Sequence, residues 1–375
     1  MDDFFADLGE LTDLSDYESF EGEEAELRKE ERRRRTSRLV PFYSTRKDVL
    51  IYFEEDKLLR TFRFDRNSIE FITDLVAPLL PKRKTRAKRN LAPVDMVLIA
   101  LQYYASGTFQ MVVGNVLRYS QSSVSRSIAS VSLALSLQSN KFIKFPTQLL
   151  DLKREFASIA RMPGVMGCVD GTYIRIKRPI LYEKAYVNRT HYHSLNVQVI
   201  CDANYRFLSV CATKPGSCHD SSIFKTSVIG KKFTAGDFGN SVILGDSGYS
   251  NTTSLFTPYG EPRNRTEIRF NNAHKTTRCV IERAFVILKK WFNVLHSEVR
   301  LSPTKTSWVT IACCVLQNIA IDRNQPFDEP IDWSSDEADM HDTLDETIGN
   351  QSDTLARRRG NEKRDREAMQ TFSGR

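Results

Sequence analysis

Apolar residues recur at helical spacing through much of the first part of the chain. One such face is closed by Pro78 and Pro81, because proline ends helices. Its members are Ile69, Ile72, Leu75, Val76 and Leu79. The pattern predicts a mostly helical region over residues 41–150.

Three short helices are predicted in the second half of that region. The first begins near Pro93, a residue favoured in a first helical turn, and ends near Gly107. The second covers residues 110–117, and Ser120 is a suitable N-cap for the third. The apolar face of the third helix is Val124, Ile128, Val131 and Leu135.

Such a trio resembles a helix-turn-helix, although an ordinary helical bundle has the same pattern. We expect polar residues on the outer face of the last helix, and whether they contact DNA is left open. They are Gln121, Ser122, Ser125, Arg126 and Ser130.

From about residue 160 the pattern changes to strands. Apolar, β-branched runs cover 165–176, 194–201 and 206–213, and a shorter apolar run lies at 241–244. Helices are expected from about Ser217, over 271–295 and over 308–321. This alternation predicts an α/β domain over residues 160–322.

Both ends of the chain lack periodic apolar faces. We expect residues 1–40 to be an unstructured acidic and basic segment. Residues 323–375 are expected to form a flexible charged tail with a short terminal helix.

Charge is distributed unevenly along the 375 residues, whose net charge is +7. Residues 1–26 hold eleven acids and no base, and residues 326–346 hold nine acids and no base. Residues 347–375 carry +3, so residues 27–325 carry +24. A body this basic predicts a polyanionic partner, and nucleic acid is the interpretation that we favour over a merely basic soluble protein.

Two clusters contribute to this charge. Seven bases between Arg28 and Arg38 are typical of a nuclear localisation signal or a nucleic-acid-binding arm, or of a solvated helix end. Six further bases lie between two predicted helices, where we expect a positive surface that binds phosphates. They are Lys82, Arg83, Lys84, Arg86, Lys88 and Arg89.

Cysteine usage and hydropathy bear on location. The seven cysteines are odd in number and form no Cys-x-x-Cys pair, which argues against a zinc ribbon and against a secreted disulfide framework. The sequence contains no run of about 18 apolar residues, so no membrane span is expected. A reducing compartment, nucleus or cytosol, fits this composition best.

Three acidic residues stand in unusual places. Asp170 lies inside an apolar strand, Asp246 follows the short apolar run, and Glu282 lies at the edge of the apolar face of the long helix. A lone buried carboxylate is costly unless it is paired or bound to metal. Together the three predict an oxygen-rich site for Mg²⁺ or Mn²⁺ that catalyses phosphodiester chemistry.

Each of these acids also has a purely structural interpretation. Asp170 would cap a turn, Asp246 would begin a helix, and Glu282 would pair with an arginine. Arg278 and Lys289 share the helical face of Glu282 and are expected to contact DNA phosphates. The metal interpretation is favoured for the set of three, because the body that carries them is basic.

The chain from about Phe62 to Ile321 resembles the PIF/Harbinger superfamily of DDE transposases and the Harbinger transposase-derived nucleases. The resemblance rests on many motifs in order. They include Met162–Gly167, Asp170-Gly171, Tyr186–Arg189, His193–Asn196, Pro215–Asp220, Leu244–Tyr249, Thr257-Pro258, Phe270-Asn271, Ile281–Phe285 and Leu288-Lys289. The chain departs from this pattern at Val286, where the family usually has glycine, and we expect that change to alter packing rather than chemistry.

The resemblance implies an RNase H-like catalytic domain that uses a divalent metal and cuts DNA, with strand transfer as a further option. Asp170, Asp246 and Glu282 match the family's catalytic triad. Asp220 matches a further metal-binding position, although an N-cap role explains it equally well. The resemblance also implies a Myb-like DNA-binding partner and a nuclear location, with cytoplasm expected when the partner is absent.

The sequence leaves two other functions open. One is a domesticated nuclear protein that binds DNA or a partner without cutting, because an intact acidic set does not establish catalytic geometry. The other is a nuclease whose substrate has nothing to do with transposition. Self-association is also left open.

Overall fold

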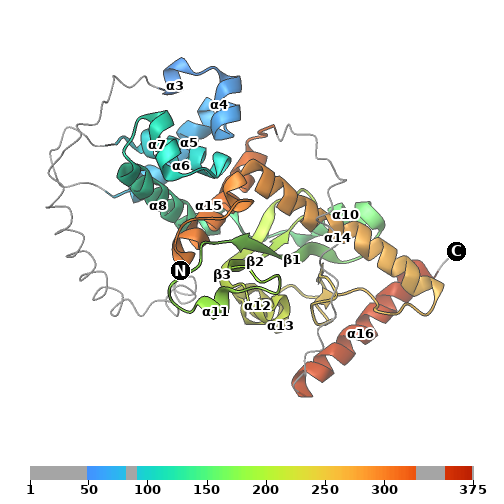
Figure 1. Ribbon diagram of the computed structural model, residues 1–375. Helices are drawn as coiled ribbons and strands as arrows, with labels where there is room; N and C mark the ends of the chain where they lie inside the picture. Colours follow the sequence, from blue (N-terminus) through green and yellow to red (C-terminus); the bar gives the residue numbers. More distant parts are fainter. Residues whose placement is uncertain (1–48, 82–90, 327–350, 374–375) are drawn as a thin grey trace. The chain divides into compact units, whose positions relative to one another are not determined.

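The computed structural model describes residues 49–81, 91–326 and 351–373. Helix α3 (Val49–Tyr52) belongs to one compact unit of the chain, and residues from Phe53 onward form another. The predictions for residues 1–40 and for the basic cluster Lys82–Arg89 lie outside the described residues. The regions discussed below all belong to the second unit. Its helices and strands are labelled in Figure 1.

The first part of this unit is helical, as the apolar periodicity predicts. Its long helices carry local start and stop signals: Asp65 accepts a hydrogen bond from Ser68 N at 2.8 Å, and Gly107 ends α6 with a φ of 64°. Ser120 caps α8 by accepting from Ser123 N. The helices are α4 (Glu55–Phe62), α5 (Arg66–Val76), η1 (Ala77–Leu79), α6 (Pro93–Ser106), α7 (Gln110–Leu117), α8 (Gln121–Leu137), α9 (Ser139–Phe142) and α10 (Leu149–Ala160).

A five-stranded mixed sheet follows, in the order β3-β2-β1-β4-β5. Strands β1, β2 and β3 pair antiparallel, whereas β4 and β5 run parallel to β1. This order, with flanking helices, confirms the α/β prediction and is consistent with an RNase H-like domain. The strands are β1 (Val165–Arg175), β2 (Ser194–Cys201), β3 (Phe207–Pro215), β4 (Val242–Leu244) and β5 (Leu255–Phe256).

Helices cover both faces of the sheet. On one face, Cys168 Sγ of β1 approaches Thr277 O of α14 (Arg265–Trp291) at 3.5 Å, and α15 (Pro303–Asp322) contacts β3. On the other face, Val169 packs in a core cluster with Phe233 of α13 (Val228–Ala235), beside α12 (Asp220–Thr226). Neighbouring residues of β1 therefore point to opposite faces, as strand geometry requires.

Asn318 of α15 joins the sheet to the helical region. Its amide nitrogen donates to Phe142 O and Phe207 O, and its oxygen accepts from Phe207 N. Helix α15 also packs against α8. Together these contacts attach the helical region firmly to the β3 edge of the sheet.

Several elements differ from the predicted ones. Helix α14 begins at Arg265 rather than near 271, because Asn264 caps a polar first turn by accepting from Glu267 N at 2.9 Å. Strand β5 has only two residues and was not predicted, since so short a run shows no alternation. The short helices α11 (Glu183–Tyr186) and η2 (Asn293–Leu295) complete the domain.

The expected short terminal helix is in fact 22 residues long. Helix α16 (Gln351–Phe372) contacts α14 and β5, so this part of the charged tail packs on the domain. Its polar sequence hid the contact, because several bonds to the domain are made by charged side chains such as Lys363 and Arg364. None of the helices in the described part of the chain is long and apolar enough to cross a membrane.

Candidate active site

Asp170 lies in the middle of β1, on the face that α14 covers. The residue is only 7% exposed, and its Oδ1 accepts from Gly171 N at 2.8 Å. Burial raises the pKa of Asp170 to about 8, and nearby Asp246 and Asp220 add to this rise, whereas Arg278 opposes it. A carboxyl group this desolvated among other acids favours a bound cation.

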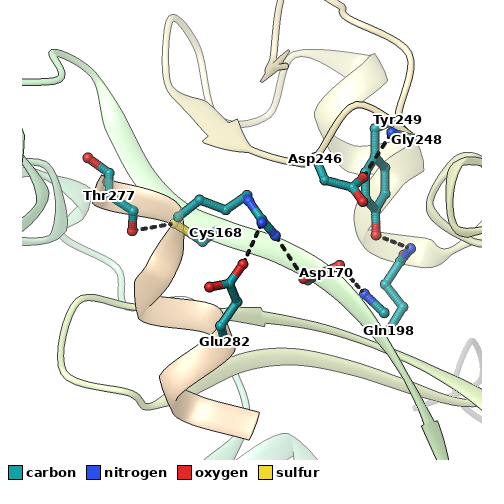
Figure 2. A network of polar contacts seen from close by, with 10 residues as sticks. Cys168, Asp170, Gln198, Asp246, Gly248, Tyr249, Thr277 and Glu282 are labelled. Atoms are coloured by element: carbon teal, nitrogen blue, oxygen red, sulfur yellow. Dashed lines mark hydrogen bonds and ion pairs between the residues drawn. The ribbon is translucent and has the colours of Figure 1, made fainter. Parts of the chain in front are cut away.

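Asp246 follows β4, and the parallel pairing of β4 with β1 brings it towards Asp170. Its Oδ1 accepts from Gly248 N at 3.1 Å, which fixes the turn after the strand. The preceding Gly245 N donates to Phe256 O at 3.0 Å, so the strand end is tied to β5. Figure 2 shows Asp170 on its strand and Asp246 just beyond the neighbouring strand, with Tyr249 beside Asp246.

Glu282 lies on α14, one helical turn after Arg278. The guanidinium of Arg278 bonds Asp170 Oδ2 at 3.1 Å through Nη1 and Glu282 Oε1 through Nη2. One cation therefore joins the helix carboxylate to the strand carboxylate (Figure 2). The structural interpretation of Glu282, pairing with an arginine, holds in this arrangement.

Asp220 reaches β1 from the opposite face of the sheet. A Cβ added to Gly171 would lie 2.2 Å from Asp220 Oδ1, so only glycine lets this carboxylate come so close. Asn196 of β2 donates to the same oxygen at 2.8 Å. The N-cap of α12 is His219, and Asp220 is the first helical residue, so the N-cap interpretation of Asp220 is wrong.

The four acids gather around one segment of β1, but they do not form a closed ligand shell. Among the described residues, no group of three His, Cys, Asp or Glu side chains is arranged to hold a metal ion. The contacts explain why: Arg278 occupies the space between Asp170 and Glu282, and Asp246 bonds its own turn. Metal binding requires these contacts to rearrange.

The residues predicted to bind DNA lie in different surroundings. Arg126 is exposed on α8, and Lys289 is half-buried on α14. Arg278 lies inside the carboxylate cluster rather than on an open surface, with its side chain 20% exposed. Their contact with DNA stays a prediction.

Supporting polar residues were missed by the sequence analysis. Gln198 of β2 donates to Tyr249 Oη at 2.9 Å and to Asp220 O at 2.8 Å, and both side chains are buried. Buried His274 of α14 bonds Phe256 O at 3.2 Å, next to the strand end that carries Asp246. The alternation of Asn196 and Gln198 in a buried strand was the available signal, because polar groups there need partners.

Comparison with known proteins gives the family. Residues 169–318 match the family model described as DDE superfamily endonuclease, a span that contains Asp170, Asp246 and Glu282. No solved structure matches the chain.

Similar proteins occur in animals and plants. The human protein called "Putative nuclease HARBI1" is 37% identical over 287 residues, which is 75% of this chain and 80% of the human protein. The Xenopus laevis protein of that name is 33% identical, over 71% of this chain and 78% of its own. The Arabidopsis thaliana "Protein ALP1-like" is 26% identical, over 73% of each chain. The chain therefore belongs to the DDE superfamily endonucleases, among the Harbinger transposase-derived nucleases.

Proposed function

We propose that this protein is a divalent-metal-dependent DNA endonuclease in which Asp170, Asp246 and Glu282 are the catalytic carboxylates. One observation carries the proposal: Asp170 is buried in β1 close to Asp246 from the end of β4, and Arg278 of α14 bonds both Asp170 and Glu282. Burying Asp170 close to a second acid is costly even with one arginine bonded to it, so the arrangement points to a function rather than to stability.

The donor set fits Mg²⁺ or Mn²⁺. Carboxylate oxygens are the ligands that these hard cations prefer. Asp220 lies on the other face of β1, but it is close enough to Asp170 to raise the pKa of that acid, and we propose that it assists in metal binding. Asn196 Oδ1 is buried beside Asp220 and has no hydrogen-bond partner among the described residues, so it is available to a further ligand or water there. When bound, such ions activate a nucleophile and stabilise the leaving oxygen of a phosphodiester.

The protein's own contribution is to hold these oxygens in place. Asn196 and Gln198 orient Asp220 and the start of α12, and Gly248 N fixes the turn after Asp246. Glu282 is carried by a rigid helix that packs against β1. Sites built on strands and helices in this way keep their geometry better than sites on loops.

DNA is the proposed substrate. The +24 charge of residues 27–325 supports this choice, since contact with phosphates is largely electrostatic. We assign phosphate contacts to Arg126, Lys289 and the cluster Lys82–Arg89. Family membership supports a Myb-like DNA-binding partner, which would supply sequence recognition, and a nuclear location for the complex.

Nicking of supercoiled plasmid tests the proposal. Purified full-length protein is incubated with plasmid and Mg²⁺ or Mn²⁺, with and without the Myb-like partner. We expect metal-dependent nicking that Asp246→Asn abolishes. Asp237→Asn is the matched control, because Asp237 is an exposed acid outside the site.

Other outcomes separate the alternatives. DNA binding without cleavage, with or without the partner, would reject the nuclease and favour the non-catalytic binding protein. Cleavage accompanied by joining of the cut ends to a second DNA would show transposase chemistry, whereas cleavage alone would show a nuclease.

A further inference from the structure

Arg278 occupies the centre of the carboxylate site. Its guanidinium bonds Asp170 Oδ2 and Glu282 Oε1 through different nitrogens, and it contacts both acids with its side chain 20% exposed. Asp170 and Glu282 come from different elements, β1 and α14 (Figure 2). The bridge is therefore a tertiary contact, unlike a solvated pair within one helix.

The oxygens that Arg278 holds are oxygens that the proposed metal site needs. Two positive groups cannot share the same carboxylates at low cost in a partly buried site, because their repulsion is weakly screened there. We propose that Arg278 is an internal counter-ion, which neutralises Asp170 and Glu282 in the metal-free protein and must release them before metal binds. This inference rests on the proposed metal-dependent function.

A purely structural salt bridge is the competing explanation. A pair four residues apart on a helix surface, such as Arg60 and Asp56 of α4, is highly exposed and stabilises little. Arg278 differs because its second bond reaches Asp170, whose side chain is 9% exposed. Removing Arg278 leaves Asp170 close to Asp246 and Asp220 without its bonded cation. If Arg278 is a counter-ion that competes with metal, the variant should bind metal more tightly. If Arg278 only stabilises the fold, its removal should not raise the affinity for metal.

Release of Arg278 also gives it a second use. The side chain is long, and its planar guanidinium suits two oxygens of a phosphate as well as two of a carboxylate. Once freed, it lies on the same helix as Glu282, within the site where the substrate phosphate would react. The same arginine would then couple metal binding to the gripping of DNA.

Mn²⁺ binding to the full-length protein, measured by titration calorimetry without DNA, tests the inference. We expect Arg278→Gln to bind Mn²⁺ roughly tenfold more tightly than the natural protein, the change that a coupling of about 1.4 kcal/mol produces. Lys275→Gln is the matched control, since Lys275 is an exposed cation on the same helix. It should bind Mn²⁺ as the natural protein does.

Thermal unfolding supplies a second readout. Metal-free Arg278→Gln should melt at a lower temperature than the natural protein, and Mn²⁺ should raise its melting temperature by a larger amount. Equal or weaker Mn²⁺ binding by a folded Arg278→Gln protein overturns the inference and leaves the metal site standing. If Arg278→Gln does not fold, Arg278→Lys decides by the same comparison, because lysine keeps the charge but cannot bridge both carboxylates.

Failure of the underlying function looks different. If the natural protein and Arg278→Gln both show no Mn²⁺ binding, the proposed metal site is wrong, and the inference falls with it. If Mn²⁺ binds equally well to Asp246→Asn, the metal lies elsewhere, with the same consequence. Both results differ from the case in which Mn²⁺ binds at the proposed site and Arg278→Gln leaves its affinity unchanged, which would reject only the role of Arg278.

Discussion

Gly171 allows two carboxylates to approach β1 from opposite faces. Asp170 precedes it in the strand, and Asp220 Oδ1 lies in the space that a side chain at position 171 would occupy. Asn196 holds that oxygen, so Asp220 cannot simply turn away. Glycine at this position is thus required by the site and not by backbone strain.

Gly171→Ala should disrupt both packing and function. The added methyl group would lie 2.2 Å from Asp220 Oδ1, so Asp220 and the start of α12 must shift. We expect a loss of about 1–3 kcal/mol of folding stability, as for other overpacked positions, and weaker Mn²⁺ binding. Urea unfolding and calorimetry measure the two effects. Gly260→Ala is the control, because a Cβ there meets nothing within 4 Å; equal effects of the two variants would contradict this account.

His274 gives the protein a predicted pH dependence. Burial lowers the pKa of His274 from 6.5 to about 4, and the neutral ring bonds Phe256 O. The unfolded chain takes up a proton at 274 below pH 6.5 while the folded protein does not. Its contribution to stability is therefore complete above pH 6.5 and is lost as the pH falls towards 4, by about 3 kcal/mol at most.

Thermal melts between pH 4.5 and 7.5 measure that contribution. His274→Gln keeps a donor for Phe256 O but does not titrate, so its stability should change less steeply with pH. His296→Gln is the matched control, since His296 is exposed. If the melting temperatures of the natural protein and of His274→Gln change equally with pH, burial of His274 does not contribute to the pH dependence of stability.

At the level of whole elements, α15 connects the sheet to the helical region through Asn318. Its side chain satisfies Phe142 O and both backbone groups of Phe207. Asn318→Ala removes this partner from two buried backbone groups of Phe207 and from the part-buried Phe142 O, and we expect a loss of roughly 3 kcal/mol. Urea unfolding measures the loss. Asn272→Ala, at an exposed position of α14, should change stability by less than about 0.5 kcal/mol.

Elements with strong local signals were predictable from the sequence. Pro93, Gly107 and Ser120 mark helix ends through their own backbone preferences, and the structure has helix ends at each of them. Strand β5 and the first turns of α14 were missed, because two residues show no alternation and the polar turns show no apolar face. Strand β5 depends on its pairing with β4, and the first turns of α14 depend on the Asn264 cap.

The candidate site was predictable in composition but not in arrangement. Asp170, Asp246 and Glu282 stand out because an acid in an apolar run needs a reason, and the family motifs contain all three. Arg278 was interpreted as a phosphate contact from its place on the helix. Its bond to Asp170, 108 residues earlier, depends on how α14 crosses β1, which no local pattern reveals.

At the scale of the whole molecule, α16 returns the end of the chain to the sheet. Arg364 is 8% exposed, donates to Thr257 O and Pro258 O, and lies 3.7 Å from the Tyr259 ring centroid. Lys363 donates to Asn240 O and Thr253 O. Helix α16 thereby holds the segment between β4 and α14, which contains Asp246.

Arg364→Ala should release α16 from the domain. Two backbone carbonyls and the face of Tyr259 lose their partner, at a cost of about 1–3 kcal/mol. Limited proteolysis with trypsin should then remove α16 several-fold faster, leaving the rest of the domain intact. Arg358→Ala is the control, because Arg358 is exposed and pairs with Glu362 of its own helix. Equal digestion rates for the two variants would mean that Arg364 does not anchor α16.

The charge of the whole molecule makes a prediction about DNA. If residues 27–325, with a charge of +24, bind the phosphate backbone, affinity must fall steeply with salt, because binding releases counter-ions. Fluorescence anisotropy with a duplex at several salt concentrations gives the slope of log affinity against log salt. Each lost phosphate contact should lower that slope by about 1. Arg126→Gln, at an exposed position of α8, should do so, whereas Arg60→Gln, whose charge already faces Asp56, should not. If neither variant changes the slope, α8 lies outside the DNA interface, and the trio α6, α7 and α8 is an ordinary bundle rather than a helix-turn-helix that reads DNA.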